Sequence, residues 1–231
     1  MTCSTKWVVR LGSAAVLGFV AMVGGAAGVG KHDVQLRPAS SVDGYVARLL
    51  INETPFPGER GWVSEEDTKG AMLAILWVLD CRLKHIPEGY TQSQIASEPC
   101  RTIIDVITAG GEKGQCDGFY RNDAGEPASV SRVNERIDYL VACANKGQPG
   151  RFARLLDYAS HLAASYVEGG IDGADRYAGL EVVGRVDVTG RAYSWMSDHG
   201  NYSPGGNFVR IPDSDQGAQG GNRFFTLRKL P

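Results

Sequence analysis

The stretch Tyr45–Arg82, YVARLLINETPFPGERGWVSEEDTKGAMLAILWVLDCR, predicts two helices joined at a corner rich in proline and glycine. Glu53 falls on the apolar stripe of the first helix, just before Pro55 and Pro57 end that helix. The stripe follows the three- and four-residue spacing of a buried helical face, with Val42, Tyr45, Val46, Leu49 and Leu50. An acid therefore occupies a position where a core residue is expected.

Glu53 is the first candidate for chemistry. A carboxyl group at the edge of an apolar surface has its charged form disfavoured by desolvation, so its pKa rises and it can keep a proton near neutral pH. A general acid needs this property. The alternative is a helix-terminal surface residue, with the helix fraying before Glu53.

The second helix has a strong start signal. Ser64 can cap its N-terminus, and the acids at 65–67 occupy the first turn, where the helix dipole favours negative charge. From Ala71 to Leu79 the sequence is apolar on every side, which is typical of a helix at the centre of a core.

These residues and a few later ones resemble, in their order, the cell wall hydrolase family that includes the spore-cortex-lytic enzymes. The resemblance implies a lysozyme-like helical domain that cleaves the glycan strands of peptidoglycan, with Glu53 as the catalytic residue. The matching elements are Asn52-Glu53, Gly58-Glu59, the positions Ala71, Ala74, Ile75, Val78, Leu79 and Arg82, then Val106-Ile107, Gly110, Gln115 and Phe119.

We therefore expect a mainly α fold, with a lysozyme-like helical domain over 31–170 and a loop-rich, partly β segment over 171–231 that completes a cleft. Two further helices are indicated, one capped by Ser131 and one between Gly150 and Gly169. In the last 60 residues glycines and aromatics alternate with short extended pieces.

A short helix is expected after Pro99, and Gly110-Gly111 closes it. Candidate substrate-binding residues lie in the loop after this helix and in the tail. Gln115, Phe119 and Tyr120 combine an amide with ring faces, which is how carbohydrate sites orient and cover a sugar. Trp195 and Glu59 complete the set. The alternatives are an ordinary surface loop for 115–120 and core packing for Trp195.

The first 30 residues predict an export signal, since Lys6 and Arg10 precede an uncharged run rich in small residues. If uncut, residues 11–30 are long enough to anchor the protein in a membrane. Either way the remainder is exported, to the periplasm or cell envelope or beyond it.

Composition narrows the partners further. Lys and Arg number 24 against 26 Asp and Glu, and no basic run is present, so nucleic acid is not an expected partner. The four cysteines after the signal permit two disulfides in an oxidising compartment, with three pairings open: Cys81, Cys100, Cys116 and Cys143. Neither the cysteine spacing nor the four scattered histidines suggests a metal or other cofactor.

Two reaction types fit a carboxyl acid at Glu53. A hydrolase needs a second carboxylate, for which Glu59, Asp117 and Asp123 are the candidates by position. A lytic transglycosylase needs only one, because the substrate's own C6 hydroxyl attacks, and we favour it. The alternative from another class is a non-catalytic peptidoglycan-binding or scaffold protein with the same shell. Own-wall remodelling and a toxin or lysin role are both compatible.

Overall fold

The computed structural model describes residues 33–146, 150–197 and 204–231, and residues 31–231 form one compact unit. The predicted signal segment, residues 1–30, lies outside the described residues. Within the described ranges, none of the helices combines the length and the apolar character needed to span a bilayer.

Helix α1 (Val42–Asn52) packs against α6 (Arg151–Val167) and α5 (Ser131–Ala144) to form a helical layer. Its predicted apolar face is buried except for Val42, which is exposed. The Ser41 hydroxyl caps the helix by accepting a hydrogen bond of 3.1 Å from the Gly44 N–H. The first predicted helix is thus confirmed, with Glu53 as its C-cap.

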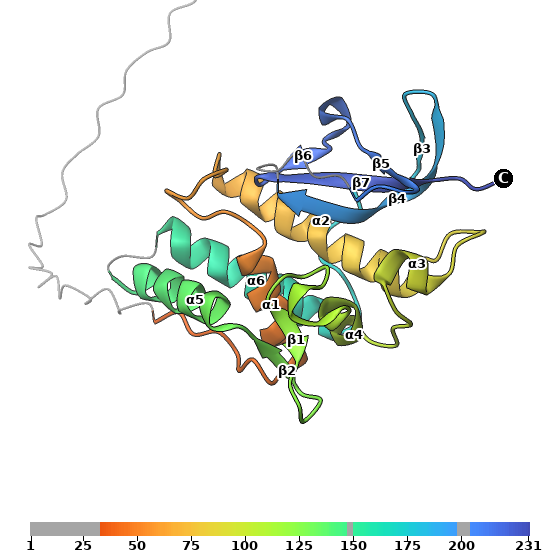
Figure 1. The fold of residues 1–231 in the computed structure, drawn as a ribbon. Coiled ribbons are helices and arrows are strands. Elements are labelled where there is room, and N and C mark those ends of the chain that lie inside the picture. The colour runs from red at the N-terminus through yellow and green to blue at the C-terminus, as the bar shows by residue number, and fades with distance from the viewer. Residues whose placement is uncertain (1–32, 147–149, 198–203) are drawn as a thin grey trace, which may run out of the picture. The chain divides into compact units, whose positions relative to one another are not determined.

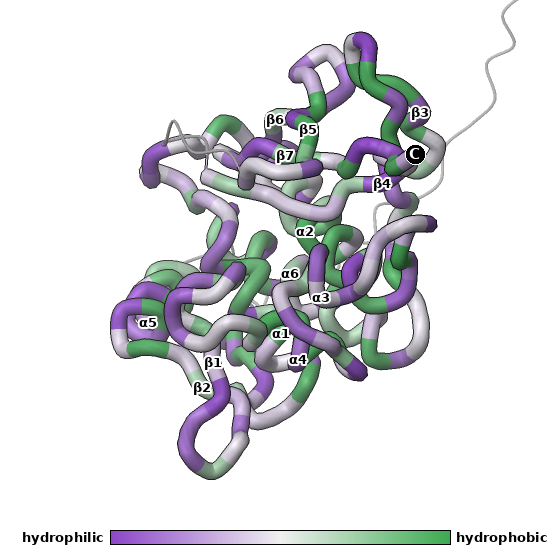
Figure 2. The backbone as a smooth tube through the Cα atoms, turned by 45° about the vertical axis from the view of Figure 1, so that its right-hand side comes forward, coloured by the Kyte–Doolittle hydropathy of each residue, from purple (hydrophilic) through white to green (hydrophobic). Residues whose placement is uncertain are grey.

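Helix α2 (Glu65–Lys84) lies between this helical layer and a β-sheet (Figure 1). As expected, the Ser64 hydroxyl caps it, accepting 3.1 Å from the Asp67 N–H. Its two-sided burial explains why the run from Ala71 to Leu79 shows no polar face: one side meets the sheet and the other meets the helices. In Figure 2, where the tube is coloured by residue hydropathy, α2 lies between the sheet and the helical layer.

The sheet is antiparallel and has five strands. They are β3 (Leu180–Val183), β4 (Val186–Ser197), β5 (Phe208–Arg210), β6 (Ala218–Gln219) and β7 (Asn222–Arg228). Four of them follow the order β3-β4-β7-β5, and β6 pairs with β7 beside them. In the central pair, Trp195 of β4 stands opposite Phe224 of β7. Strand β4 and the short β6 contact α2.

Shorter elements surround this frame. They are α3 (Gln92–Ala96), α4 (Ile103–Thr108), the 3-10 turns η1 (Gly111–Lys113) and η2 (Asp213–Asp215), and a hairpin of β1 (Phe119–Arg121) and β2 (Pro127–Ser129). We expected α4 but not α3 or the hairpin. Ser131 is the first residue of α5, and Val130 takes the N-cap position.

The expected mainly α class is wrong. Six helices and the five-stranded sheet make a mixed fold, in which the sheet is a complete layer packed on helices rather than an appendage to a lysozyme-like helical domain. The sequence hides this because Ala192–Trp195 of β4 are buried one after another, so the alternation typical of a half-exposed strand is missing.

The cysteines also differ from expectation, because all four are free thiols in the structure. Cys81 belongs to a small apolar cluster with Tyr90 and Tyr193, whereas Cys100 and Cys116 belong to the main core. Cys143 is partly exposed on α5. None of the three possible pairings is made.

Candidate functional site

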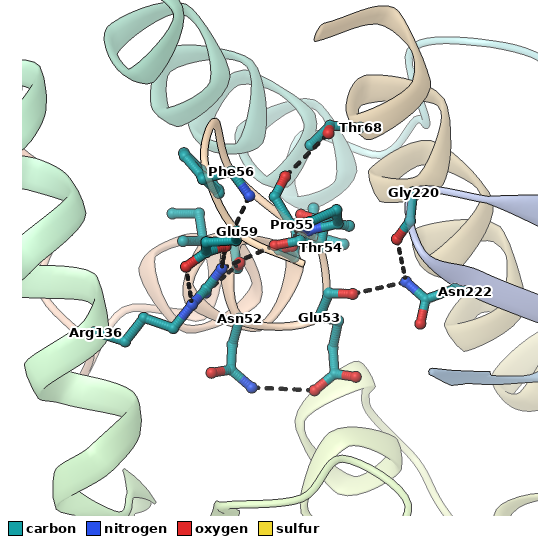
Figure 3. A network of polar contacts seen from close by, with 12 residues as sticks. Asn52, Glu53, Thr54, Pro55, Phe56, Glu59, Thr68, Arg136, Gly220 and Asn222 are labelled. Carbon is teal, nitrogen blue, oxygen red and sulfur yellow. Dashed lines mark hydrogen bonds and ion pairs between the residues drawn. The ribbon is translucent and has the colours of Figure 1, made fainter. Parts of the chain in front are cut away.

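A pocket of about 450 Å³ opens beside Glu53, where the α1–α2 corner, helix α5 and the sheet meet. The corner contributes Glu53 and Glu59, α5 contributes Arg136, and the sheet contributes Ser197 and Asn222. Figure 3 shows Asn52, Glu53, Thr54 and Pro55 between Arg136 on one side and Asn222 on the other. Among the described residues, the lining is Asn52, Glu53, Thr54, Pro55, Glu59, Arg60, Arg136, Ser197, Gly220, Gly221 and Asn222.

The backbone of Glu53 is fixed from two directions. Its N–H donates to the carbonyl of Leu49 at 2.9 Å, and this hydrogen bond closes the last turn of α1. Its carbonyl accepts 2.7 Å from the side-chain amide of Asn222, at the start of β7 (Figure 3). The site is therefore anchored to both the helical layer and the sheet.

The carboxyl group of Glu53 is held by two donors. Asn52 Nδ2 donates to Oε1 at 3.1 Å, and Trp195 Nε1 donates to Oε2 at 3.0 Å. Glu53 is half-buried and lines the pocket.

Burial raises the pKa of Glu53 above its ordinary value of 4.5. The two hydrogen bonds act in the opposite direction, since they stabilise the anion. The charge of Asp117 raises the pKa further, and that of Arg136 lowers it. The net rise favours a carboxyl group that keeps its proton at higher pH than a surface glutamate does.

Glu59 lies in the same pocket, but its charge is paired. Arg136 Nε donates to Oε1 at 2.9 Å and Nη2 to Oε2 at 2.6 Å, which is a bidentate ion pair. The Phe56 N–H adds a bond of 2.7 Å. Arg136 also donates to the carbonyls of Ile51 and Thr54, so this pair organises the corner. Glu59 is therefore poorly placed to act as a free base.

Neither of the other two acids considered as partners of Glu53 lines this pocket, although the charge of Asp117 acts on Glu53. Asp117 forms an exposed ion pair of 2.6 Å with Arg132. Asp123 lines a separate hollow of about 490 Å³ with Tyr120 and Arg121, at the β1–β2 hairpin. The structure thus places one carboxyl group, that of Glu53, in the pocket without an ion-pair partner among the described residues.

Trp195, which donates to Glu53, also lines a second pocket of about 570 Å³. It is only 7% exposed, and the guanidinium of Arg82 lies 5.2 Å from its ring centroid. Gln115 lines this second pocket and donates 2.8 Å to the Ser97 hydroxyl. Two predicted substrate residues, Trp195 and Gln115, therefore share one pocket that adjoins Glu53.

The other two aromatic candidates are not in the site. Phe119 is fully buried, with its ring 5.4 Å from that of Tyr45 in an edge-on arrangement. Tyr120 faces the separate hairpin hollow. Phe119 is thus a core residue. Tyr120 lines neither the Glu53 pocket nor the pocket that contains Trp195 and Gln115.

The sequence assigned no role to three residues that organise the site, namely Arg82, Arg136 and Asn222. Arg82 is one of the positions of the resemblance, and it is a cation at the end of an otherwise apolar run on α2. No local pattern predicts the roles of Arg136 and Asn222, since their partners are 77 and 169 positions away in the chain.

No group of three or more potential metal-ligating side chains is found among the described residues. Comparison with known proteins gives no match to a family model, a curated protein or a solved structure. The site must be interpreted from its own chemistry.

Proposed function

We propose that this protein cleaves the glycan strands of peptidoglycan, with Glu53 as the general acid. The observation that carries the proposal is a carboxyl group with a raised pKa that opens on a pocket between two structural layers. The order of the sequence motifs supports the choice of substrate. Export, which the signal predicted at 1–30 would supply, is a requirement of this function.

The environment of the acid favours a lytic transglycosylase over a hydrolase. Arg136 engages both oxygens of Glu59, the one other carboxylate among the described residues that line the pocket. A mechanism with a single acid therefore fits better than one with two carboxylates.

The proposed reaction uses Glu53 twice. The carboxyl group gives its proton to the glycosidic oxygen as the bond from that oxygen to C1 breaks. The C6 hydroxyl of the same muramyl residue then attacks C1, and its proton passes to the Glu53 carboxylate. The products are a 1,6-anhydro-muramyl end and a new free hydroxyl on the other fragment, with Glu53 restored to its acid form.

The arrangement of the pockets suits a linear substrate. Strand β4 contributes Ser194, Trp195 and Met196 to the larger pocket and Ser197 to the Glu53 pocket. Sugars on either side of a cleaved bond could therefore lie along the end of one strand. Amides and an indole, the groups present here, are typical of carbohydrate sites.

The test is digestion of purified peptidoglycan by the protein and by Glu53→Gln, with the soluble products analysed by mass spectrometry. The substitution keeps the side-chain shape and removes the proton, so we expect a loss of roughly 10²–10⁴-fold in rate. Glu66→Gln is a matched control, because Glu66 is exposed on the first turn of α2. Products with reducing ends would point to a hydrolase, and equal activity of wild type and Glu53→Gln would contradict the proposal.

A non-catalytic peptidoglycan-binding protein is the second candidate. The observation in its favour is that both oxygens of Glu53 accept hydrogen bonds and its carbonyl binds Asn222, so Glu53 could serve only to link α1 to the sheet. Under this function, wild type and Glu53→Gln would release no fragments and would pellet equally with insoluble wall.

A further inference from the structure

Arg82 is a buried cation at the C-terminal end of α2. It is 2% exposed, and no Asp or Glu among the described residues forms an ion pair with it. Nε donates to the Tyr193 carbonyl at 2.7 Å, whereas Nη1 is buried and has no hydrogen-bond partner in the described part of the chain. Two features of this residue, the uncompensated charge and the unused donor, require an explanation.

Burial of an unpaired cation is unfavourable, and proteins normally compensate it with a carboxylate. Burial lowers the pKa of Arg82 to about 10, which still leaves it protonated at neutral pH. A residue that served only to pack would be replaceable by a neutral side chain of similar length. The charge is therefore compatible with a ligand that arrives from outside.

The charge of the pocket beside Arg82 suits an anionic ligand. Its volume is about 570 Å³, and its described lining contains two cations, Arg82 and Lys113, and no Asp or Glu. This contrasts with the chain as a whole, whose formal net charge is −2. The neutral polar lining consists of Gln94, Ser97, Gln115 and Ser194, which supply amides and hydroxyls.

Trp195 orients the guanidinium. The Arg82 Cζ lies 5.2 Å from the indole centroid, so the ring provides a cation–π contact with a group that also lines the pocket. Such a contact restrains the guanidinium, whose planar set of donors matches the two oxygens of a carboxylate.

We propose that this pocket binds the carboxylate of an organic acid, with Arg82 as the principal donor and Lys113 at the rim. A carboxylate fits better than a phosphate, because one restrained guanidinium supplies the planar fork, whereas phosphate sites usually combine several backbone N–H groups. The acid is either free in solution or carried by a sugar. The second source rests on the proposed function, since muramyl units of peptidoglycan carry a free lactyl carboxyl group where the peptide stem has been removed.

The experiment uses the Glu53→Gln protein, so that no ligand is consumed, and follows binding by NMR titration. The probes are N-acetylmuramic acid, its methyl ester, acetate and inorganic phosphate. We expect the acid to bind roughly tenfold or more tightly than the ester, which is the gain that one charge-assisted hydrogen bond gives. Equal affinity of acid and ester, or tighter binding of phosphate than of either carboxylate, would overturn the proposal.

Two variants, Arg82→Met and Lys113→Gln, test whether the preference for the acid over its ester arises in this pocket. Arg82→Met should fold, because an unpaired buried charge is replaced by an apolar chain, and should lose the preference for the acid. Lys113→Gln changes an exposed residue and should weaken the acid alone by a few fold. If Arg82→Met does not fold, Lys113→Gln decides, and an unchanged preference in it refutes the pocket.

The same titrations distinguish a free acid from a sugar-borne one, and they test the carboxylate pocket independently of glycan cleavage. Acetate binding as tightly as N-acetylmuramic acid indicates a free acid, whereas a clear advantage for N-acetylmuramic acid indicates a sugar-borne one. Binding requires no turnover, so a protein that prefers the acid but leaves the wall intact supports the carboxylate pocket and removes only the proposed function.

Discussion

Trp195 Nε1 donates a hydrogen bond of 3.0 Å to Glu53 Oε2, joining residues 142 positions apart in the chain. Glu53 ends α1 in the helical layer, and Trp195 lies near the end of β4 in the sheet. The bond therefore ties the candidate acid to the opposite layer and partly offsets the effect of burial on its pKa.

Trp195→Phe should raise the pKa of Glu53 further. The substitution keeps an aromatic ring and removes the N–H that stabilises the anion. Titration of the Glu53 carboxyl carbon by NMR checks this, and the alkaline limb of a pH–rate profile should move to higher pH if Glu53 is the acid. Trp77→Phe is the matched control, since its indole N–H binds Gly173. A downward shift, or an equal shift in both variants, would show that the hydrogen bond does not tune the site.

Glu53→Gln should stabilise the protein at neutral pH relative to wild type. A carboxyl group with a raised pKa in the folded state favours folding below its ordinary value of 4.5, and this contribution is lost as pH rises through the folded pKa. Glutamine does not titrate, so the difference in free energy of unfolding should grow over that interval and then become constant. Urea unfolding at several pH values measures it, with Glu66→Gln as control. A difference independent of pH would mean that Glu53 has an ordinary pKa.

The sequence predicts the local part of this arrangement. The stripe of α1 and the Ser64 cap of α2 are set by residues three and four apart, and the position of Glu53 on that stripe follows from the same spacing. Trp195 and Asn222 reach Glu53 only because β4 pairs with β7 and packs against α2, which no local pattern specifies. Arg136, rather than the adjacent Arg60, pairs with Glu59 for the same reason.

Arg136→Gln should destabilise the α1–α2 corner. Glu59 loses its bidentate partner, and the carbonyls of Ile51 and Thr54 lose a charged donor. A loss of about 2 kcal/mol or more in unfolding free energy is expected, because hydrogen bonds to charged groups contribute about 1.5–3 kcal/mol. Chemical denaturation of Arg136→Gln, Glu59→Gln and the double variant measures the coupling. Additive effects of the two single changes would show that the pair is not a unit.

Gly220→Ala should be more damaging than an alanine at another glycine with positive φ. Gly220 has φ +52°, and a Cβ there would overlap with the side chain of Ala71 on α2. Gly125, in the β1–β2 hairpin, has φ +77° and nothing within 4 Å of such a Cβ. Both changes carry backbone strain, but only the first also separates β6 from α2. The difference between their unfolding free energies should be about 1–3 kcal/mol. Equal losses would mean that the sheet and α2 are not closely packed there.

Phe119→Leu should affect stability alone, whereas Gln115→Ala should affect wall digestion alone. Phe119 is fully buried against Tyr45, so its shortening should lower the unfolding free energy by about 1–3 kcal/mol through lost packing and leave wall digestion unchanged at temperatures where the protein is folded. Gln115 is exposed and lines the pocket beside Trp195, so its truncation should leave stability within about 0.5 kcal/mol and weaken digestion. Thermal unfolding and product release, measured on the same preparations, check both. The opposite pattern, with activity lost at Phe119 and kept at Gln115, would place the substrate at the hairpin and not along β4.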